Sequence, residues 1–115
     1  MNICIIGSGY VGLVTGSCLA DSGNNVICLD IDQSKIADLK EGKVGIYEPG
    51  LSSVVERNIM SNRLQFTTDY KSAIESSEII FLAVSTPPNN DGSANLEYIK
   101  SASTELSKYI NSYKL

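Results

Sequence analysis

The chain begins with a short uncharged run, residues 2–6, that stops at a cluster of glycines. The run is rich in β-branched residues, which is typical of a strand buried on both faces of a parallel sheet. Glycines follow at Gly7, Gly9 and Gly12, and small or apolar residues at helical spacing continue to Ser22. A buried strand, a glycine turn and a helix in this order predict the first unit of an α/β domain.

The rest of the chain alternates between apolar runs and capped helical segments. We expect strands at 2–6, 26–29, 64–67 and 79–84, and helices at 12–22, 32–40, 51–60, 69–75 and 95–111. This order predicts a Rossmann-type fold, a doubly wound parallel sheet with right-handed crossovers. Such a domain has about six strands, so we expect residues 1–115 to form a sheet truncated after about four. Lys114 and Leu115 are expected to begin another strand.

The glycine segment also predicts a ligand, because each position has a distinct role in dinucleotide binding. Gly7 permits the tight turn, Gly9 lets the backbone approach a pyrophosphate, and Gly12 allows close helix–strand packing. The helix N-terminus then offers free N–H groups to the phosphates. Tyr10 and Val11 are expected to contact the cofactor through backbone atoms and apolar contact, with their side chains mainly packed. The alternative is a purely structural glycine turn.

Polar residues at two later strand ends complete the predicted site. Asp30 lies 18 positions after Gly12, where a carboxylate can accept hydrogen bonds from the ribose hydroxyls and repel the 2′-phosphate of NADP. The expected cofactor is therefore NAD. Lys35 could reach the same ribose, and the Thr86 hydroxyl could bond the cofactor from the loop after the fourth strand. The alternatives are that Asp30 is a solvated acid at a strand end, that Lys35 is an ordinary exposed lysine, and that Thr86 lies in a plain surface turn. Asp32 is expected to cap the second helix.

Composition excludes several other functions. The chain has no histidine, a net charge of −4 and no basic run, so nothing predicts a nucleic-acid or membrane partner. Cys4, Cys18 and Cys28 lack metal-ligand spacing. We expect all three to be buried, no metal site and a cytoplasmic location. No set of residues forms a catalytic base or nucleophile.

Several segments taken together resemble the UDP-glucose/GDP-mannose dehydrogenase family, over the whole chain. The combination is more specific than the glycine segment alone. The matching segments are Gly7-Ser8-Gly9-Tyr10-Val11-Gly12-Leu13, Asp30-Ile31-Asp32 with Lys35-Ile36, Tyr47-Glu48-Pro49-Gly50-Leu51, and Ser85-Thr86-Pro87 with Asp91-Gly92.

The resemblance implies the NAD-binding portion of an enzyme that oxidises the C6 alcohol of a nucleotide sugar to a carboxylate through a cysteine thioester. The family's cofactor-contacting positions match Tyr10, Val11, Asp30, Lys35 and Thr86. Its catalytic residues and its central, dimer-forming helix would lie beyond residue 115, so we expect the chain alone to be inactive and the full-length enzyme to be a homodimer. The motif predicts no particular contact for its glutamate.

The substrate and the exact class stay open at this stage. Overall likeness favours UDP-glucose, with UDP-N-acetylmannosamine and GDP-mannose as alternatives. A stand-alone NAD-binding or sensor module is a further possibility, and the four-strand count weighs against it. Another Rossmann dehydrogenase, of the hydroxyacyl-CoA type, is disfavoured by the Tyr-Glu-Pro-Gly-Leu segment.

Overall fold

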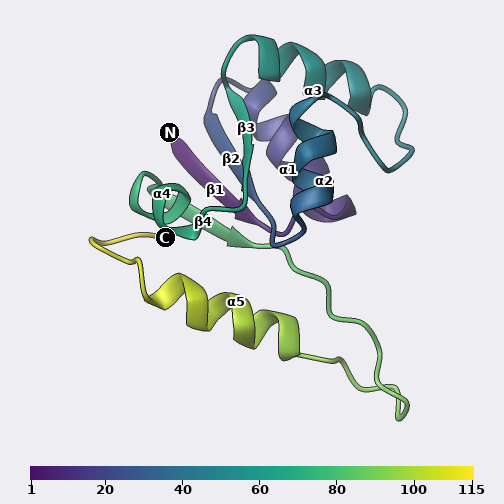
Figure 1. Cartoon of the computed structure of the whole chain (residues 1–115), viewed down its shortest axis with the longest axis vertical. Coiled ribbons are helices and arrows are strands. Elements are labelled where there is room, and N and C mark those ends of the chain that lie inside the picture. Colours follow the sequence, from purple (N-terminus) through teal and green to yellow (C-terminus); the bar gives the residue numbers. More distant parts are fainter.

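A four-stranded parallel sheet in the order β3-β2-β1-β4 forms the centre of the computed structural model, which describes all residues 1–115 (Figure 1). Its strands are β1 (Asn2–Ile6), β2 (Asn25–Leu29), β3 (Leu64–Thr67) and β4 (Ile79–Leu82). The helices are α1 (Tyr10–Asp21), α2 (Gln33–Lys40), α3 (Leu51–Met60), α4 (Tyr70–Glu75) and α5 (Glu97–Ser107). The predicted element order and fold class are confirmed.

The sheet carries a separate apolar core on each face. Alternate residues of β1 point to opposite sides, so Ile3 and Ile5 join the core beneath α1, α2 and α3, whereas Cys4 and Ile6 join the core beneath α4 and α5. This alternation follows from the two-residue period of a strand. Both faces are therefore covered, which explains why β1 is apolar throughout its buried length.

Several predicted boundaries differ from the observed ones, most clearly in α1, β4 and α5. Helix α1 begins at Tyr10 because the Leu13 amide already donates to the Gly9 carbonyl, at 2.9 Å. Strand β4 ends at Leu82, two residues early, because its neighbour β1 ends at Ile6 and the chain turns away there. Helix α5 is shorter than expected at both ends, and the Asn95 side chain accepts a hydrogen bond from the Glu97 amide at its start.

Leu115 occupies the position of a further strand residue beside β4. Its amide donates to the Glu78 carbonyl at 3.0 Å, and its carbonyl accepts from the Ile80 amide at 2.7 Å. This is the hydrogen-bond pattern of a parallel neighbour. Residues 114–115 are not part of a strand in the structure, so the expectation that they begin another strand stays a prediction, which these two hydrogen bonds support.

One of the three cysteine predictions is wrong. Cys4 and Cys28 are buried as expected, and burial raises the pKa of each thiol to about 12. Cys18 is exposed. It lies on α1 outside the stripe that packs on the sheet, where Gly16 sits directly over the Cys28 sulfur. None of the five helices is long and apolar enough to cross a membrane.

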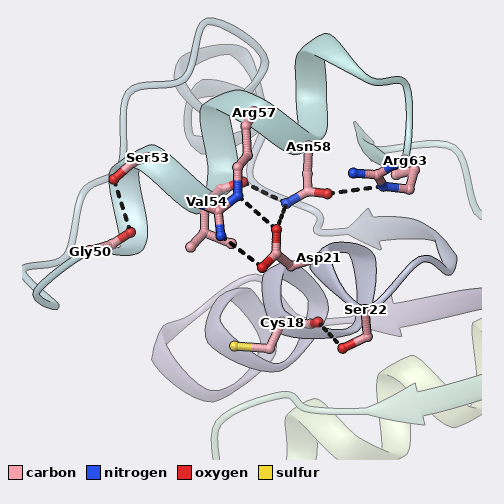
Figure 2. A network of polar contacts seen from close by, with 9 residues as sticks. All are labelled: Cys18, Asp21, Ser22, Gly50, Ser53, Val54, Arg57, Asn58 and Arg63. Carbon is pink, nitrogen blue, oxygen red and sulfur yellow. Dashed lines mark hydrogen bonds and ion pairs between the residues drawn. The ribbon is translucent and has the colours of Figure 1, made fainter.

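Polar contacts at its C-terminal end fix α1 against α3 (Figure 2). Asp21 accepts two hydrogen bonds from the Arg57 guanidinium, both at 2.7 Å, and one from the buried Asn58 amide at 2.9 Å. Hydrogen bonds from Arg57 and Asn58 hold the pKa of the Asp21 carboxyl well below its usual range. The last residue of α1 is thereby tied to the second half of α3.

We predict that Gly12→Ala destabilises the chain strongly. A Cβ at Gly12 would lie 1.8 Å from the Gly7 carbonyl oxygen, so β1 and α1 would have to separate, at a cost of about 3 kcal/mol or more. Urea unfolding of both proteins measures the difference. Gly45→Ala is the matched control, because a Cβ there meets no atom within 4 Å. Equal stability of the two variants would contradict the packing argument.

Candidate dinucleotide site

A cleft of about 1070 Å³ opens at the carboxyl edge of the sheet. Strand β1 lies at its centre, between β2 and β4. The chain runs outward from β1 through β2 to β3 and then crosses back to β4 on the other side of β1. This is the switch point at which open α/β sheets bind ligands. Of the eight predicted site residues, seven line the cleft and Gly12 lies behind it. The seven are Gly7, Gly9, Tyr10, Val11, Asp30, Lys35 and Thr86.

The three glycines of the loop are needed for different physical reasons. Gly7 has a φ of +101°, and a Cβ there would lie 2.7 Å from the Ala83 carbonyl oxygen. Gly12 is required by its contact with Gly7. A Cβ on Gly9, in contrast, would meet nothing within 4 Å. The fold therefore needs glycine at Gly7 and Gly12, whereas Gly9 keeps an open approach to the backbone from the cleft side.

The N-terminus of α1 is suited to an anion. The amides of Tyr10, Val11 and Gly12 make no hydrogen bond within the chain, the cap residue Gly9 offers no side chain, and no acidic residue lies in the first turn. Free amides and the positive end of the helix dipole favour a phosphate group here. The open backbone at Gly9 and these donors together fit a dinucleotide diphosphate.

Asp30 follows β2 and is held by four hydrogen bonds. Its Oδ2 accepts from the Ser8 amide at 2.9 Å, the Ser8 hydroxyl at 2.8 Å and the Lys35 ammonium at 3.1 Å, and its Oδ1 accepts from the Asp32 amide at 3.0 Å. Burial acts to raise the pKa of the Asp30 carboxyl, but these bonds outweigh it and the pKa is lowered. Asp30 is therefore a fixed, ionised acceptor at the cleft.

Lys35 and Asp32 show how α2 contributes to this arrangement. The Asp32 carboxylate accepts from the Lys35 amide at 3.0 Å, which confirms its predicted role as the N-cap. That cap directs the first turn so that the Lys35 ammonium meets Asp30. The cation reduces the cost of keeping a charged carboxylate whose side chain is only 11% exposed.

The expected packing of Tyr10 and Val11 side chains is wrong. Tyr10 is 53% and Val11 66% exposed, because the first turn of α1 lies at the sheet edge, beyond the strands that cover the rest of the helix. The Tyr10 hydroxyl donates to the Glu48 carboxylate, a contact that the sequence did not predict.

Sequence reasoning also missed Ser8, which lies behind the cleft, and three residues that line it. Ser8 is nearly buried and binds Asp30 through two atoms; its place between two loop glycines was the available signal. Ile31 is 75% exposed and lines the cleft beside Asp30. Tyr70 and Tyr98 line the cleft from α4 and α5, and nothing in their local sequence marks them.

The fold and this site define a Rossmann-type dinucleotide-binding domain. The family model for the NAD-binding domain of the UDP-glucose/GDP-mannose dehydrogenases matches residues 1–115, and the chain belongs to that family. Its cofactor is NAD.

Individual relatives agree with this assignment. UDP-glucose 6-dehydrogenase TuaD of Bacillus subtilis is 51% identical over 98% of the chain, and UDP-glucose 6-dehydrogenase of Rhizobium meliloti is 46% identical over 98%. The solved structure of GDP-mannose dehydrogenase from Pseudomonas aeruginosa covers 96% of the chain with a TM-score of 0.93 and 38% identity. The chain spans 24%, 26% and 25% of these three proteins, respectively.

We predict that Asp30→Asn lowers the free energy of unfolding by about 1–3 kcal/mol at neutral pH, because a charged acceptor of several hydrogen bonds is lost. The pKa of Asp30 is lowered in the folded chain. Its charge therefore stabilises the fold above the ordinary aspartate pKa of about 4, and this contribution is lost as the pH falls through the folded-state value.

The difference between the wild type and Asp30→Asn should accordingly shrink below about pH 4 in urea unfolding at a series of pH values. Asp38→Asn, which changes an exposed carboxylate on α2, serves as the control and should show little difference at any pH. A difference in the free energy of unfolding between the wild type and Asp30→Asn that persisted to the lowest pH would contradict this account.

Proposed function

We propose that this chain is the NAD-binding part of a longer nucleotide-sugar dehydrogenase that oxidises UDP-glucose to UDP-glucuronate. The main observation in support is the cleft at the switch point, in which the uncapped amides of the α1 N-terminus and the ionised Asp30 carboxylate lie together. The lengths of the relatives support the wider claim, because the chain spans about a quarter of each UDP-glucose 6-dehydrogenase it matches.

Each predicted site residue has a part in holding NAD under this proposal. The diphosphate lies against the amides of Tyr10 and Val11, over Gly9. The adenosine ribose hydroxyls donate to Asp30, while Lys35 holds that carboxylate in place. The Thr86 hydroxyl contacts the cofactor from the loop after β4.

Gly7 lines this site and Gly12 lies behind it, and both allow α1 to begin close to β1. Bound NAD supplies a hydride acceptor for the oxidation of the substrate alcohol. The chain's own contribution is to bind and orient NAD, since none of its three cysteines lines the cleft. We therefore propose that residues 1–115 alone produce no NADH from UDP-glucose.

The substrate is proposed from the relatives and not from the cleft. The names of the two curated relatives above both specify UDP-glucose, at 51% and 46% identity, whereas the structure at 38% identity is a GDP-mannose dehydrogenase. From the family resemblance we also propose that the longer enzyme is a homodimer. We further propose a cytoplasmic location, which agrees with the three unpaired cysteines.

We predict that the chain prefers NAD over NADP by about tenfold or more, because the Asp30 carboxylate repels the 2′-phosphate. Isothermal titration calorimetry with both dinucleotides tests this. Asp30→Ala should weaken NAD binding by about tenfold or more, since charged hydrogen bonds to the ribose are lost. The same change should reduce the preference for NAD over NADP. Equal binding of NAD by the wild type and the variant would remove Asp30 from the site.

We also predict that Gly9→Ala weakens NAD binding and leaves the stability of the fold nearly unchanged. A methyl group there meets no atom of the chain, so the urea midpoint should change little. The same methyl group would stand where the diphosphate approaches, and NAD affinity should fall by about tenfold or more. Wild-type affinity in a folded Gly9→Ala chain would count against the proposed position of the diphosphate.

A further inference from the structure

The Tyr47-Glu48-Pro49-Gly50-Leu51 segment marks the family, yet the proposed function gives it no role. In the structure it forms a type II β-turn. The Leu51 amide donates to the Glu48 carbonyl at 3.0 Å, and Gly50 has a φ of 82° and a ψ of −9°. Pro49 restricts the first central position, and the second requires the positive φ that glycine adopts readily. The turn is therefore stiff.

This turn is also anchored in the core. Leu51 is 4% exposed and belongs to the same apolar cluster as Val55, one turn further along α3. Gly50 is the N-cap of α3. The Glu48 side chain thus extends from a rigid base, and its carboxylate accepts the hydrogen bond from the Tyr10 hydroxyl.

The Tyr10 contact lies at one end of α1, and a second set of contacts lies at the other end. Tyr10 is the first residue of α1 and meets the turn that precedes α3. Asp21 is the last residue of α1 and meets Arg57 and Asn58 in the second half of α3 (Figure 2). The two helices therefore lie side by side in the same direction, joined near both ends. Two separated attachments restrict both the sliding and the rotation of α1 along α3.

The end of α1 that Glu48 holds is the one that faces the cleft. Tyr10 lines the cleft, and the free amides of Tyr10 and Val11 lie in the same turn. We infer that Glu48 is a positioning residue for the cofactor: through Tyr10 it fixes the first turn of α1 so that these amides are oriented before NAD arrives.

This inference rests on the proposed function. Its physical basis is preorganisation, since a turn that is already ordered loses less freedom when the ligand binds. The protonation state of the phenol agrees with it, because the hydrogen bond to Glu48 and its negative charge raise the pKa of Tyr10. A tyrosine is protonated at neutral pH in any case, and the raised pKa keeps Tyr10 a donor over a wider pH range. The competing interpretation is a surface contact that only ties two loops together.

The test compares Glu48→Ala, Glu48→Gln and Tyr10→Phe with the wild-type chain. The dissociation constant of NAD is measured by calorimetry and the stability by urea unfolding. Removing one partner of the hydrogen bond should weaken NAD binding by about three- to tenfold. Glu48→Gln should restore part of the affinity, because its amide oxygen still accepts from Tyr10. Glu41→Ala is the control, since Glu41 precedes the same loop and pairs only with Lys43, at 2.6 Å.

Two further measurements separate positioning from a general structural role. In a double-mutant cycle, Tyr10→Phe combined with Glu48→Ala should cost about as much NAD affinity as either change alone, because both remove the same contact. With ¹³C-labelled tyrosine, the pKa of the Tyr10 ring should fall toward its ordinary value in Glu48→Gln. Both results are expected while the urea midpoint stays near that of the wild type.

The outcomes distinguish this inference from the proposed function. Wild-type NAD affinity in Glu48→Ala would overturn the inference alone. A loss of affinity that Glu41→Ala shares, or that is additive in the double mutant, would overturn it as well. A wild-type chain that is folded and binds no NAD would overturn the proposed function and this inference together.

Discussion

The close contact between the start of α1 and the end of β1 is the constraint on which the site depends. Gly12 lies so near the Gly7 carbonyl that no side chain fits between them. Because of this contact, the helix starts directly at the sheet edge, and no side chain caps its first amides. The glycine segment therefore determines where α1 begins, and its proposed role in holding a diphosphate depends on that position.

Asp30 joins three parts of the structure through one carboxylate. It receives hydrogen bonds from Ser8 after β1, from the backbone of its own turn, and from Lys35 at the start of α2. These donors keep the carboxylate ionised in a largely buried place. Asp30 is therefore a structural link between these parts of the fold as well as the proposed acceptor for the ribose hydroxyls.

The outer helices complete the site in different ways. Helix α3 and the turn that precedes it hold α1 at both ends, through Arg57 with Asn58 in the helix and through Glu48 in the turn. Helices α4 and α5 cover the opposite face of the sheet (Figure 1) and supply Tyr70 and Tyr98 to the cleft wall. The cleft thus lies between the helices on one face of the sheet, α1 to α3, and those on the other face, α4 and α5. The order of the strands brings loops that are distant in sequence to this one edge.

Local pattern alone determined the element order, the α/β class and the positions of the glycine loop, Asp30 and the Asp32 cap, because periodicity, turn chemistry and capping act within a few residues. It failed where a side chain's surroundings come from elsewhere. The exposure of Cys18 depends on which face of α1 meets the sheet, and that of Tyr10 on where α1 begins relative to the sheet edge. The bonds from Ser8 to Asp30 and from Tyr10 to Glu48 join residues 22 and 38 positions apart. Only the tertiary structure decides such contacts, since the packing of helices on the sheet sets them and no local pattern encodes it.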